Sequence, residues 1–438
     1  MTSKPKAKVY RADLYGLREG KYDYLRETDI SKTKWTEVSP KSPFYLFTVS
    51  QSEEFFEEYQ AGWKITDISP LNSVGVVTSR DKFAIGFTRD EVANRMKEFC
   101  QKSLSDIEVS KRFSLKDTGT FKVSSVRETI CKTEWEDNIL DYNYRPFDSR
   151  HIIFSDEILE RSRKEVMQHL AHDNISLIFM RQVALDNVYS HFLATEAMAD
   201  ARAFYSNKGI INQAPLYLYP DESSNNVFDQ PTSNPGGRRP NLAPEFIEDV
   251  AGRLGLAFVD DGRGDLTSTF GPEDVFHYIY AVFHAPSYRE RYAEFLKIDF
   301  PRVPLTQNLE LFRSLAAKGE RLVALHLMER TGNIMTSYPE DGDNVVDKPR
   351  FKEDEGGETG RVYINETQYF GGVPSAVWAF YVGGYQVLHK WLKDRKGREL
   401  SYNDLRHYQR IVAALSETID TMSEIDETID EAGGWPLA

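Results

Sequence analysis

Arginine and amide side chains recur among aromatic and β-branched residues between Tyr144 and Gln182, where "YRPFDSRHIIF" (144–154) and "LIFMRQ" (177–182) occur. Arginine can donate two hydrogen bonds to the O6 and N7 atoms of guanine, and glutamine or asparagine can bind adenine in a similar way. Lysine and arginine can also neutralise phosphates. The segment therefore indicates either a surface that reads DNA or a core that is held together by salt bridges.

Two further stretches carry donors of the same kind, "NPGGRRPN" (234–241) and "KWLKDRKGR" (390–398). The predicted DNA-binding residues are Arg145, Arg150, Arg161, Arg163, Arg181, Gln182, Arg238, Arg239, Asn241, Lys393, Arg395, Lys396 and Arg398. A structural role stays open for each arginine, because residues 144–182 hold six basic and six acidic residues that could pair.

Sequence motifs for catalysis are missing or incomplete. "SPFY" (42–45) differs by one residue from the Pro-Pro-aromatic turn that grips the amine in amino-methyltransferases, and no glycine-rich loop precedes it. Asp13, Glu19 and Lys21 match the residue types of a magnesium nuclease but lie too close together. No phosphate-binding GxxxxGK(S/T) sequence occurs. We therefore predict no catalytic residue, no metal site and no cofactor in this chain.

Length and composition indicate a globular protein of two or three domains, with 438 residues of which 40% are hydrophobic. No apolar run approaches the roughly 20 residues that a membrane-spanning helix needs, and the N-terminus lacks the apolar part of a secretory signal. We expect a cytoplasmic protein without a membrane partner. In that compartment Cys100 and Cys131 are expected to be two buried thiols rather than a disulfide.

The formal net charge of −14 argues against a nucleic-acid partner, but the charge is unevenly distributed. Residues 411–438 hold seven carboxylates and no lysine or arginine. Residues 389–410 hold seven lysines and arginines against three acids. Basic segments compatible with DNA binding are therefore present in an acidic chain.

The elements expected around these residues predict an α+β fold in which a β-rich block precedes a helical C-terminal subdomain. Residues 1–135 mix strand and helix patterns and form a predicted α/β connector. Residues 136–262 are β-rich and contain a long surface loop (221–246) dense in Ser, Asn, Pro and Gly. Residues 263–438 are predicted to be helical. Their last helix has an apolar stripe formed by Ile411, Leu415, Ile419, Met422, Ile425 and Ile429.

Several short motifs occur in a fixed order along nearly the whole chain. They are "DLYGLREGKYDYL" (13–25), "SPFYLF" (42–47), "WKITDISPLNSVGVVTSRDKFAI" (63–85), "YRPFDSRHIIF" (144–154), "RSRKEVMQHLAHDNISLIFMRQ" (161–182), "PLYLYP" (215–220), "IYAVFHAPSYRERYAEFLKIDFPRVPL" (279–305) and "GGYQVLHKWLKDRKGRELS" (383–401). In this order they resemble the C-terminal target recognition, or specificity, region of type ISP single-chain restriction–modification enzymes.

The resemblance implies that the chain is the last part of an enzyme that carries a nuclease, a translocating ATPase and an adenine-N6 methyltransferase before its target recognition domain. Residues 1–135 would then include the end of the methyltransferase domain. The implied partners are double-stranded DNA and a methyltransferase domain, in cis or in trans. S-adenosylmethionine, ATP and Mg²⁺ would act in the upstream domains. Whether the chain is a fragment, a separate specificity subunit or a remnant stays open.

Motifs shared by enzymes that read different DNA sites suit scaffold or backbone contacts better than base selection. Arg145 and Arg150 are therefore expected to contact phosphates or to pair within the protein. Base-reading residues are expected on less motif-like segments, namely 183–213 and 221–241.

Two alternatives remain at this level. The chain could be a stand-alone degenerate methyltransferase or metal nuclease that uses "SPFY" or the acids near Asp13. It could also be a protein-interaction module that docks through its acidic C-terminal helix.

Overall fold

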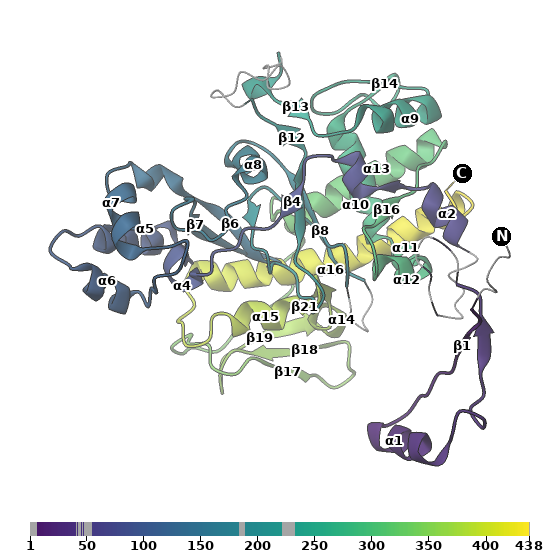
Figure 1. The fold of residues 1–438 in the computed structure, drawn as a ribbon, viewed down its shortest axis with the longest axis horizontal. Helices are drawn as coiled ribbons and strands as arrows, with labels where there is room; N and C mark the ends of the chain where they lie inside the picture. The colour runs from purple at the N-terminus through teal and green to yellow at the C-terminus, as the bar shows by residue number, and fades with distance from the viewer. Residues whose placement is uncertain are drawn as a thin grey trace, which may run out of the picture. The chain divides into compact units, whose positions relative to one another are not determined.

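The protein is described here by a computed structural model that covers residues 7–40, 42, 45, 47, 55–183, 189–220 and 233–437 (Figure 1). The chain divides into two compact units, Met1–Glu57 and Glu58–Ala438. In the small unit, β1 (Val9–Arg11) pairs antiparallel with β2 (Thr36–Val38), and α1 (Arg18–Glu27) lies between them in sequence. None of the residues of α1 is buried. Pro43 and Phe44 of the "SPFY" motif lie outside the described residues.

Short elements from Phe56 onward lead into a helical layer. They are α2 (Phe56–Ala61), β3 (Trp63–Lys64), α3 (Ile65–Ile68), β4 (Ser73–Val74), α4 (Asp81–Ala84), β5 (Ile85–Gly86), α5 (Arg89–Phe99), α6 (Asp106–Arg112), α7 (Val123–Ile130) and η2 (Trp135–Asn138). Thr88 caps α5, and Ser105 with Glu108 forms a capping box for α6. Apolar residues of α5 and α7, such as Met96 and Val126, pack into one core with Ile152 of the following hairpin.

A β-rich block follows and supplies most strands of two four-stranded sheets and both strands of a two-stranded sheet, β12–β13. Its elements are β6 (Ile139–Arg145), β7 (Asp148–Ile153), α8 (Lys164–Met167), η3 (Gln168–Ala171), β8 (Ser176–Phe179), β9 (Phe192–Thr195), β10 (Met198–Ala199), β11 (Asn212–Pro215), β12 (Tyr217–Leu218), η5 (Pro235–Gly237) and β13 (Arg239–Pro240). One sheet has the order β10-β6-β7-β5 and the other β4-β11-β8-β9. The sequence "YRPFDSRHIIF" is thus the turn and second strand of the β6–β7 hairpin.

The rest of the chain is mainly helical. It contains α9 (Pro244–Leu254), β14 (Ala257–Phe258), β15 (Thr269–Phe270), α10 (Pro272–His284), α11 (Pro286–Arg291), α12 (Ala293–Leu296), β16 (Arg302–Val303), α13 (Leu309–His326), β17 (Arg350–Glu353), β18 (Thr359–Tyr363), β19 (Tyr369–Pro374), α14 (Ser375–Trp378), β20 (Tyr381–Val382), β21 (Tyr385–Gln386), α15 (Val387–Lys393) and α16 (Tyr402–Glu431). The α+β class that the sequence predicts is therefore confirmed. The three-stranded antiparallel sheet β17–β18–β19 is an element that the sequence analysis did not predict.

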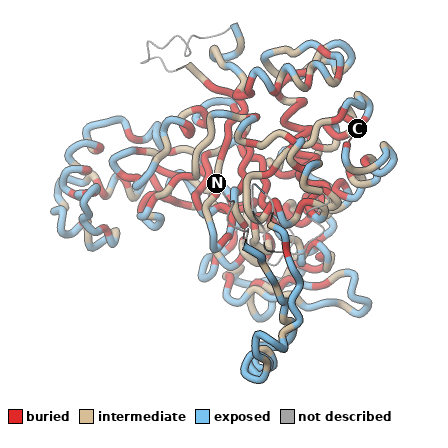
Figure 2. The backbone as a smooth tube through the Cα atoms, turned by 45° about the vertical axis from the view of Figure 1, so that its right-hand side comes forward, coloured by how far each residue is buried: buried red, intermediate tan, exposed pale blue. Residues whose placement is uncertain are grey.

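Helix α16, the long yellow helix in Figure 1, connects the parts of the large unit. It packs against α10, α11 and α13 and also against α14, α15 and β19. Of the predicted apolar stripe, Ile411, Leu415, Met422, Ile425 and Ile429 are buried and Ile419 is half-buried. Figure 2 shows buried residues concentrated where such elements meet. The apolar stripe of α16 is therefore covered within the fold.

The expected pair of thiols is wrong, because the structure joins Cys100 and Cys131 in a disulfide. The two residues are the C-caps of α5 and α7. The Arg127 side chain donates hydrogen bonds to the carbonyl oxygens of Phe99 (2.8 Å) and Gln101 (2.9 Å), which holds the two helix ends together. The sulfurs therefore meet although 31 residues separate them in sequence.

Three predicted element boundaries also change. The sequence "ARAFYS" (201–206) has a composition that predicts a strand, but it is a turn, because the Asp200 carboxylate accepts a hydrogen bond from the backbone of Arg202. The sequence "ILERSRKEVMQHLAH" (158–172) has a pattern that predicts one helix, but α8 starts only at Lys164, because the backbone of Arg161 pairs with that of Val77. The expected loop 221–246 lies outside the described residues up to 232, and its last three residues form the first turn of α9.

In the part of the chain that the structure describes, none of the helices combines the length and the apolar composition needed to cross a membrane.

Candidate nucleic-acid interface

The two basic motifs that the sequence analysis singled out meet in space at Asp148. This residue follows the turn of the β6–β7 hairpin, and its side chain is 1% exposed. It accepts hydrogen bonds from Arg150 Nη2 (2.7 Å) in the same strand and from Arg395 Nη2 (2.9 Å) after α15. Burial alone would raise the pKa of Asp148, but the two guanidinium groups outweigh it and keep the pKa below its usual value. One carboxylate thus links segments that lie 247 residues apart.

Aromatic rings separate the guanidinium groups around this carboxylate. Arg150 lies over Tyr144 and Phe87, with its Cζ atom 3.7 and 4.2 Å from the ring centroids. Arg398 also lies over Phe87, at 4.0 Å, and Arg395 lies over Trp391, at 3.5 Å. Such contacts stabilise a cation by about 0.5 to 2 kcal/mol each. The term arginine–aromatic cluster is used below for Phe87, Tyr144, Arg145, Arg150, Tyr385, Arg395 and Arg398.

Arg145 is the second buried cation of the cluster. It forms an ion pair with Asp200 (Nη1 to Oδ1, 2.9 Å) and lies over the Tyr144 ring at 3.9 Å. Tyr142 donates its hydroxyl to the other oxygen of Asp200 at 2.8 Å. Burial lowers the pKa of Arg145, but the charge of Asp200 outweighs it and the net shift is upward. The guanidinium therefore stays charged and anchors the hairpin to the segment that follows β10.

The outer edge of the cluster is exposed and basic. Lys393, Lys396 and Arg398, called the basic rim below, are all exposed. Arg398 is bound to Glu91 at 2.9 Å, and Lys396 approaches Asp347 at 3.8 Å. These exposed ion pairs are weak, so phosphate groups could displace their carboxylates at small cost.

A loop formed by residues 202–208, called the 202–208 loop below, adjoins the same cluster. The Tyr385 hydroxyl donates to the carbonyl oxygen of Arg202 (3.4 Å), and the backbone of Tyr205 donates to Gly383 (2.7 Å). Arg202, Tyr205, Asn207 and Lys208 are exposed. Arginine and asparagine are residue types that can bind base edges, and the loop falls in the 183–213 segment where base readers are expected.

The predicted residues near 238 divide between internal and surface positions. Arg238 lies over the Tyr217 ring at 3.8 Å and forms an ion pair with Asp261 at 2.7 Å. Asn241 is buried, and its amide donates to the carbonyl oxygens of Leu71 (2.7 Å) and Pro215 (2.9 Å). Arg239 is exposed in β13. Arg238 and Asn241 therefore stabilise the loop, and Arg239 is free to face solvent.

The remaining predicted residues lie apart from the cluster in the hydrogen-bond network. Arg181 is 63% exposed and approaches Asp299 at 3.4 Å, and Gln182 donates to the carbonyl oxygen of Ile298 at 3.2 Å. Arg161 is exposed. Arg163 precedes α8 with a positive φ of 58°. Of these four residues, Arg181 and Gln182 thus have side-chain contacts, and both contacts are with residues 298–299.

Sequence reasoning missed Phe87, Tyr385 and the 202–208 loop as parts of the site. Phe87 lies 57 positions before Tyr144, in a short strand–turn segment, and carries no motif of its own. An electrostatic argument could have pointed to a ring such as that of Phe87. Arginines that lie close together repel one another, and aromatic ring faces between them stabilise their charges.

No group of three or more histidine, cysteine or acidic side chains among the described residues could hold a metal ion. Asp13, one of the acids that match a nuclease pattern, instead accepts hydrogen bonds from Arg11 at 2.8 and 2.6 Å. What the candidate site offers to a ligand is cation–aromatic contacts and hydrogen-bond donors.

Comparison with known families gives one match over most of the chain. A sequence model described as the type ISP C-terminal specificity domain matches residues 67–424. No curated protein sequence matches the chain significantly.

Three solved structures with a similar fold are protein–DNA complexes. A cryo-EM structure of a DrdV–DNA complex aligns with a TM-score of 0.68 at 19% identity, over 93% of this chain and 42% of that chain. A nuclease-deletion mutant of the type ISP restriction–modification enzyme LlaGI, in complex with a DNA substrate mimic, aligns with a TM-score of 0.64 at 18% identity, over 95% and 33%. The ATP-dependent type ISP enzyme LlaBIII bound to DNA aligns with a TM-score of 0.62 at 18% identity, over 93% and 26%. This chain thus spans less than half the length of each of them.

Proposed function

The chain belongs to the family of type ISP C-terminal specificity domains, and from this premise we propose that it recognises a specific double-stranded DNA sequence. The observation that carries the proposal for this chain is the arginine–aromatic cluster with its basic rim and the adjoining 202–208 loop. The family match covers all three of them. A specificity domain is a binding module, so the work of this chain is recognition rather than chemistry.

The side chains of the site are assigned different roles according to how exposed they are. The inner arginines of the cluster, Arg145, Arg150 and Arg395, are paired with buried carboxylates and act as scaffold. The basic rim contacts phosphates, since its side chains are exposed and only weakly paired. Base contacts fall to exposed side chains of the 202–208 loop, with Arg161, Arg181 and Arg239 as further candidates on the surface. Arg238, Gln182 and Asn241 then hold those segments in place through their side-chain contacts.

The rest of the proposal concerns proteins or domains beyond this chain. The relatives of similar fold are more than twice as long as the part they share with it. We infer that the chain works with an adenine-N6 methyltransferase and a coupled nuclease, in cis or in trans. S-adenosylmethionine, ATP and Mg²⁺ would act there. The cytoplasm is where such an enzyme meets DNA.

A titration of fluorescent duplex DNA of random sequence with the full chain tests the DNA-binding part of the proposal. Affinity should fall steeply as salt rises from about 50 to 200 mM, because bound phosphates release counterions. The variant Lys393→Ala with Lys396→Ala should weaken binding, whereas Lys132→Ala, an exposed lysine of the α7 end, should not. Equal affinity of both variants for DNA would refute the basic rim as the phosphate contact. No DNA binding at low salt would refute DNA recognition by this chain alone.

A further inference from the structure

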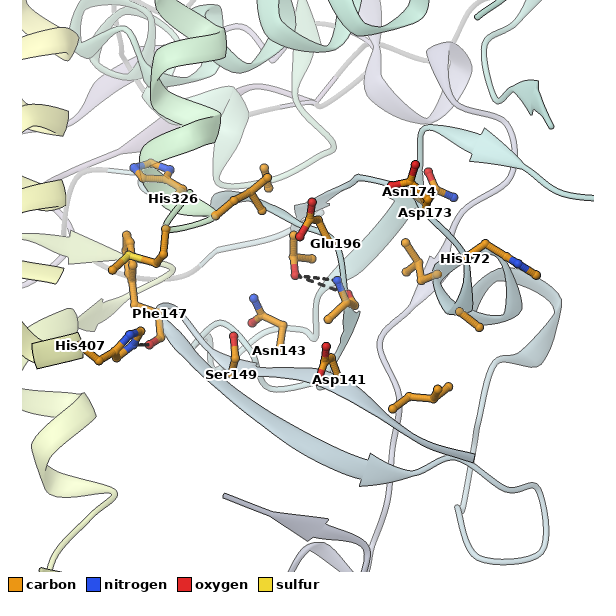
Figure 3. A pocket seen from close by; sticks show the side chains of 18 residues that line it. Asp141, Asn143, Phe147, Ser149, His172, Asp173, Asn174, Glu196, His326 and His407 are labelled. Carbon is orange, nitrogen blue, oxygen red and sulfur yellow. Dashed lines mark hydrogen bonds between the residues drawn. The ribbon is translucent and has the colours of Figure 1, made fainter. Parts of the chain in front are cut away.

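A pocket of about 510 Å³ lies on the other face of the β6–β7 hairpin (Figure 3). In the antiparallel register Asp141 faces His151 and Asn143 faces Ser149, whereas Tyr142 faces Arg150. Side chains of directly opposed residues point to the same face, and neighbours along a strand alternate. Asp141, Asn143 and Ser149 therefore point into the pocket, while Arg150 points to the arginine–aromatic cluster. The pocket is separate from the surface proposed to bind DNA.

Carboxylates surround this pocket without a matching number of cations. Asp141, Asp173 and Glu196 line it, and Glu196 lies across from the hairpin residues in Figure 3. His151 approaches Asp141 at 3.3 Å, and Arg238 approaches Asp173 at 3.9 Å. Among the described residues, no cationic side chain forms an ion pair with Glu196. Partial burial, followed by the charges of Glu329, Asp173 and Asp141, raises the pKa of Glu196.

An unpaired amide lies at the base of the same pocket. Asn143 is 7% exposed, and its Oδ1 atom is buried without a hydrogen-bond partner in the described structure. Its side chain is directed from β6 into the pocket, between Ser149 and Glu196 (Figure 3). A buried amide oxygen without a partner costs about 1 to 3 kcal/mol. A turn of the Asn143 amide about its last side-chain bond would bring this oxygen to the pocket, where a donor-bearing ligand would recover that stability. This amide is an observation independent of the carboxylates.

The chemistry of the lining defines the ligand. Apolar side chains lie between the polar groups, and they include Leu140, Leu170, Ala171, Ala194, Ala197 and Leu327. The carboxylates do not form a group of three close enough to hold a metal ion. The phosphate of a nucleotide would be repelled by them. A ligand that suits all these features carries two or more separated ammonium groups on a flexible aliphatic chain.

We propose that this pocket binds an aliphatic di- or polyamine. Its ammonium groups pair with Glu196 and with Asp141 or Asp173, one of its N–H groups donates to Asn143 Oδ1, and its methylene groups lie along the apolar lining. Two of the lining histidines, His326 and His407, do not oppose this, since burial lowers the pKa of His326 to about 3 and also lowers that of His407, leaving both rings neutral near pH 7.

Isothermal titration of the full chain with putrescine and with spermidine, at low salt and pH 7.5, tests the proposal. The matched neutral probe is 1,4-butanediol, and Mg²⁺ is the probe for unspecific counterion binding. Both amines should bind with a stoichiometry near one, and butanediol should not bind. Glu196→Gln should weaken spermidine binding about fivefold, whereas Glu427→Gln, the same charge change at an exposed position of α16, should leave it unchanged.

The variant Asn143→Leu separates a binding role from a structural one. Replacing an unpaired buried amide by an apolar group of similar size should keep or raise the melting temperature. Under the proposal it also weakens spermidine binding about tenfold. Unchanged spermidine affinity in Asn143→Leu, equal losses in Glu196→Gln and Glu427→Gln, or displacement of spermidine by an equal charge of Mg²⁺ would each overturn the site. Binding of deoxycytidine monophosphate in place of the amines would also overturn it, in favour of a nucleobase pocket.

Discussion

At the scale of single residues, Asp148 compensates the positive charges that are buried at the β6–β7 hairpin. It is buried between Arg150 and Arg395, and each of these side chains is about one-tenth exposed or less. Removing one partner of a buried charge pair leaves the others uncompensated.

Asp148→Ala should therefore lower the free energy of unfolding by roughly 3 to 5 kcal/mol, as measured by urea denaturation. Glu399→Gln, an exposed acid in the same C-terminal segment, is the matched control and should change stability by less than about 0.5 kcal/mol. A loss below about 1 kcal/mol for Asp148→Ala would mean that the two arginines find other partners or water, and the scaffold role assigned to them would be wrong.

Substitutions of Arg398 and Arg202 are expected to change DNA binding in different ways. Arg398→Ala should weaken binding to every DNA sequence to a similar extent and reduce the dependence of log Kd on log salt by about one contact. Arg202→Ala should cost about 1 to 3 kcal/mol on the preferred site only and relax one base position. Competition titrations with the preferred and a scrambled duplex distinguish the two patterns. If the patterns are exchanged, the roles of the basic rim and the 202–208 loop are exchanged as well.

The sequence predicted which residues lie at the site better than it predicted what each of them does there. The arginines of "YRPFDSRH" and "KWLKDRKGR" do lie together, but their pairing through Asp148 depends on a contact across 247 positions. Neither motif reveals it, because the partner could equally have been Asp156 or Glu157. Asn241 has the side chain of a base reader, yet its amide is used by Leu71 and Pro215. Burial decides whether a side chain of this kind can reach DNA, and burial follows from the fold rather than from the local sequence.

At the scale of elements, long periodic helices were predictable and short strands were not. α10 begins at Pro272 as its first-turn proline indicates, and the stripe from Ile411 to Ile429 locates α16. The strand predicted at 201–206 failed because one side-chain hydrogen bond, from Asp200, favours a turn. The three-stranded sheet from β17 to β19 lies among residues whose polar and glycine-rich sequence carries no clear alternation.

The packing of α10, α13 and α16 encloses histidines that must stay neutral. His326 contacts Tyr280 of α10 and donates or accepts a hydrogen bond with Thr418 of α16 at 3.0 Å. Burial lowers the pKa of His326 to about 3 and that of His277 to about 4. Each group binds a proton more readily in the unfolded chain, where the pKa is about 6.5.

Stability from these histidines is thus complete above about pH 6.5 and declines as the pH falls from there toward about 4. His326→Gln should make the free energy of unfolding less dependent on pH in this window, by up to about 1.4 kcal/mol per pH unit. Urea denaturation at pH 7.5, 6 and 5 measures the difference. His172→Gln, at an exposed position, is the control. The same pH dependence in both variants would show that folding does not lower the pKa of His326.

At the scale of the whole molecule, the family was predictable because eight motifs in a fixed order carry it, and the match over residues 67–424 confirms that prediction. The net charge of −14 pointed away from DNA, since a sum does not show where charge lies. In the fold the basic rim and the 202–208 loop both adjoin the arginine–aromatic cluster. Most acids of residues 411–438 lie instead on α16, which packs on α10 and α13.

Sequence-specific recognition of DNA is the central claim, and selection of duplexes from a random pool by the full chain at moderate salt tests it most directly. We predict enrichment of one short asymmetric sequence, and loss of a single base preference in the Arg202→Ala variant. Retention of DNA without enrichment of any sequence, after several rounds, would contradict the claim and leave only unspecific phosphate binding.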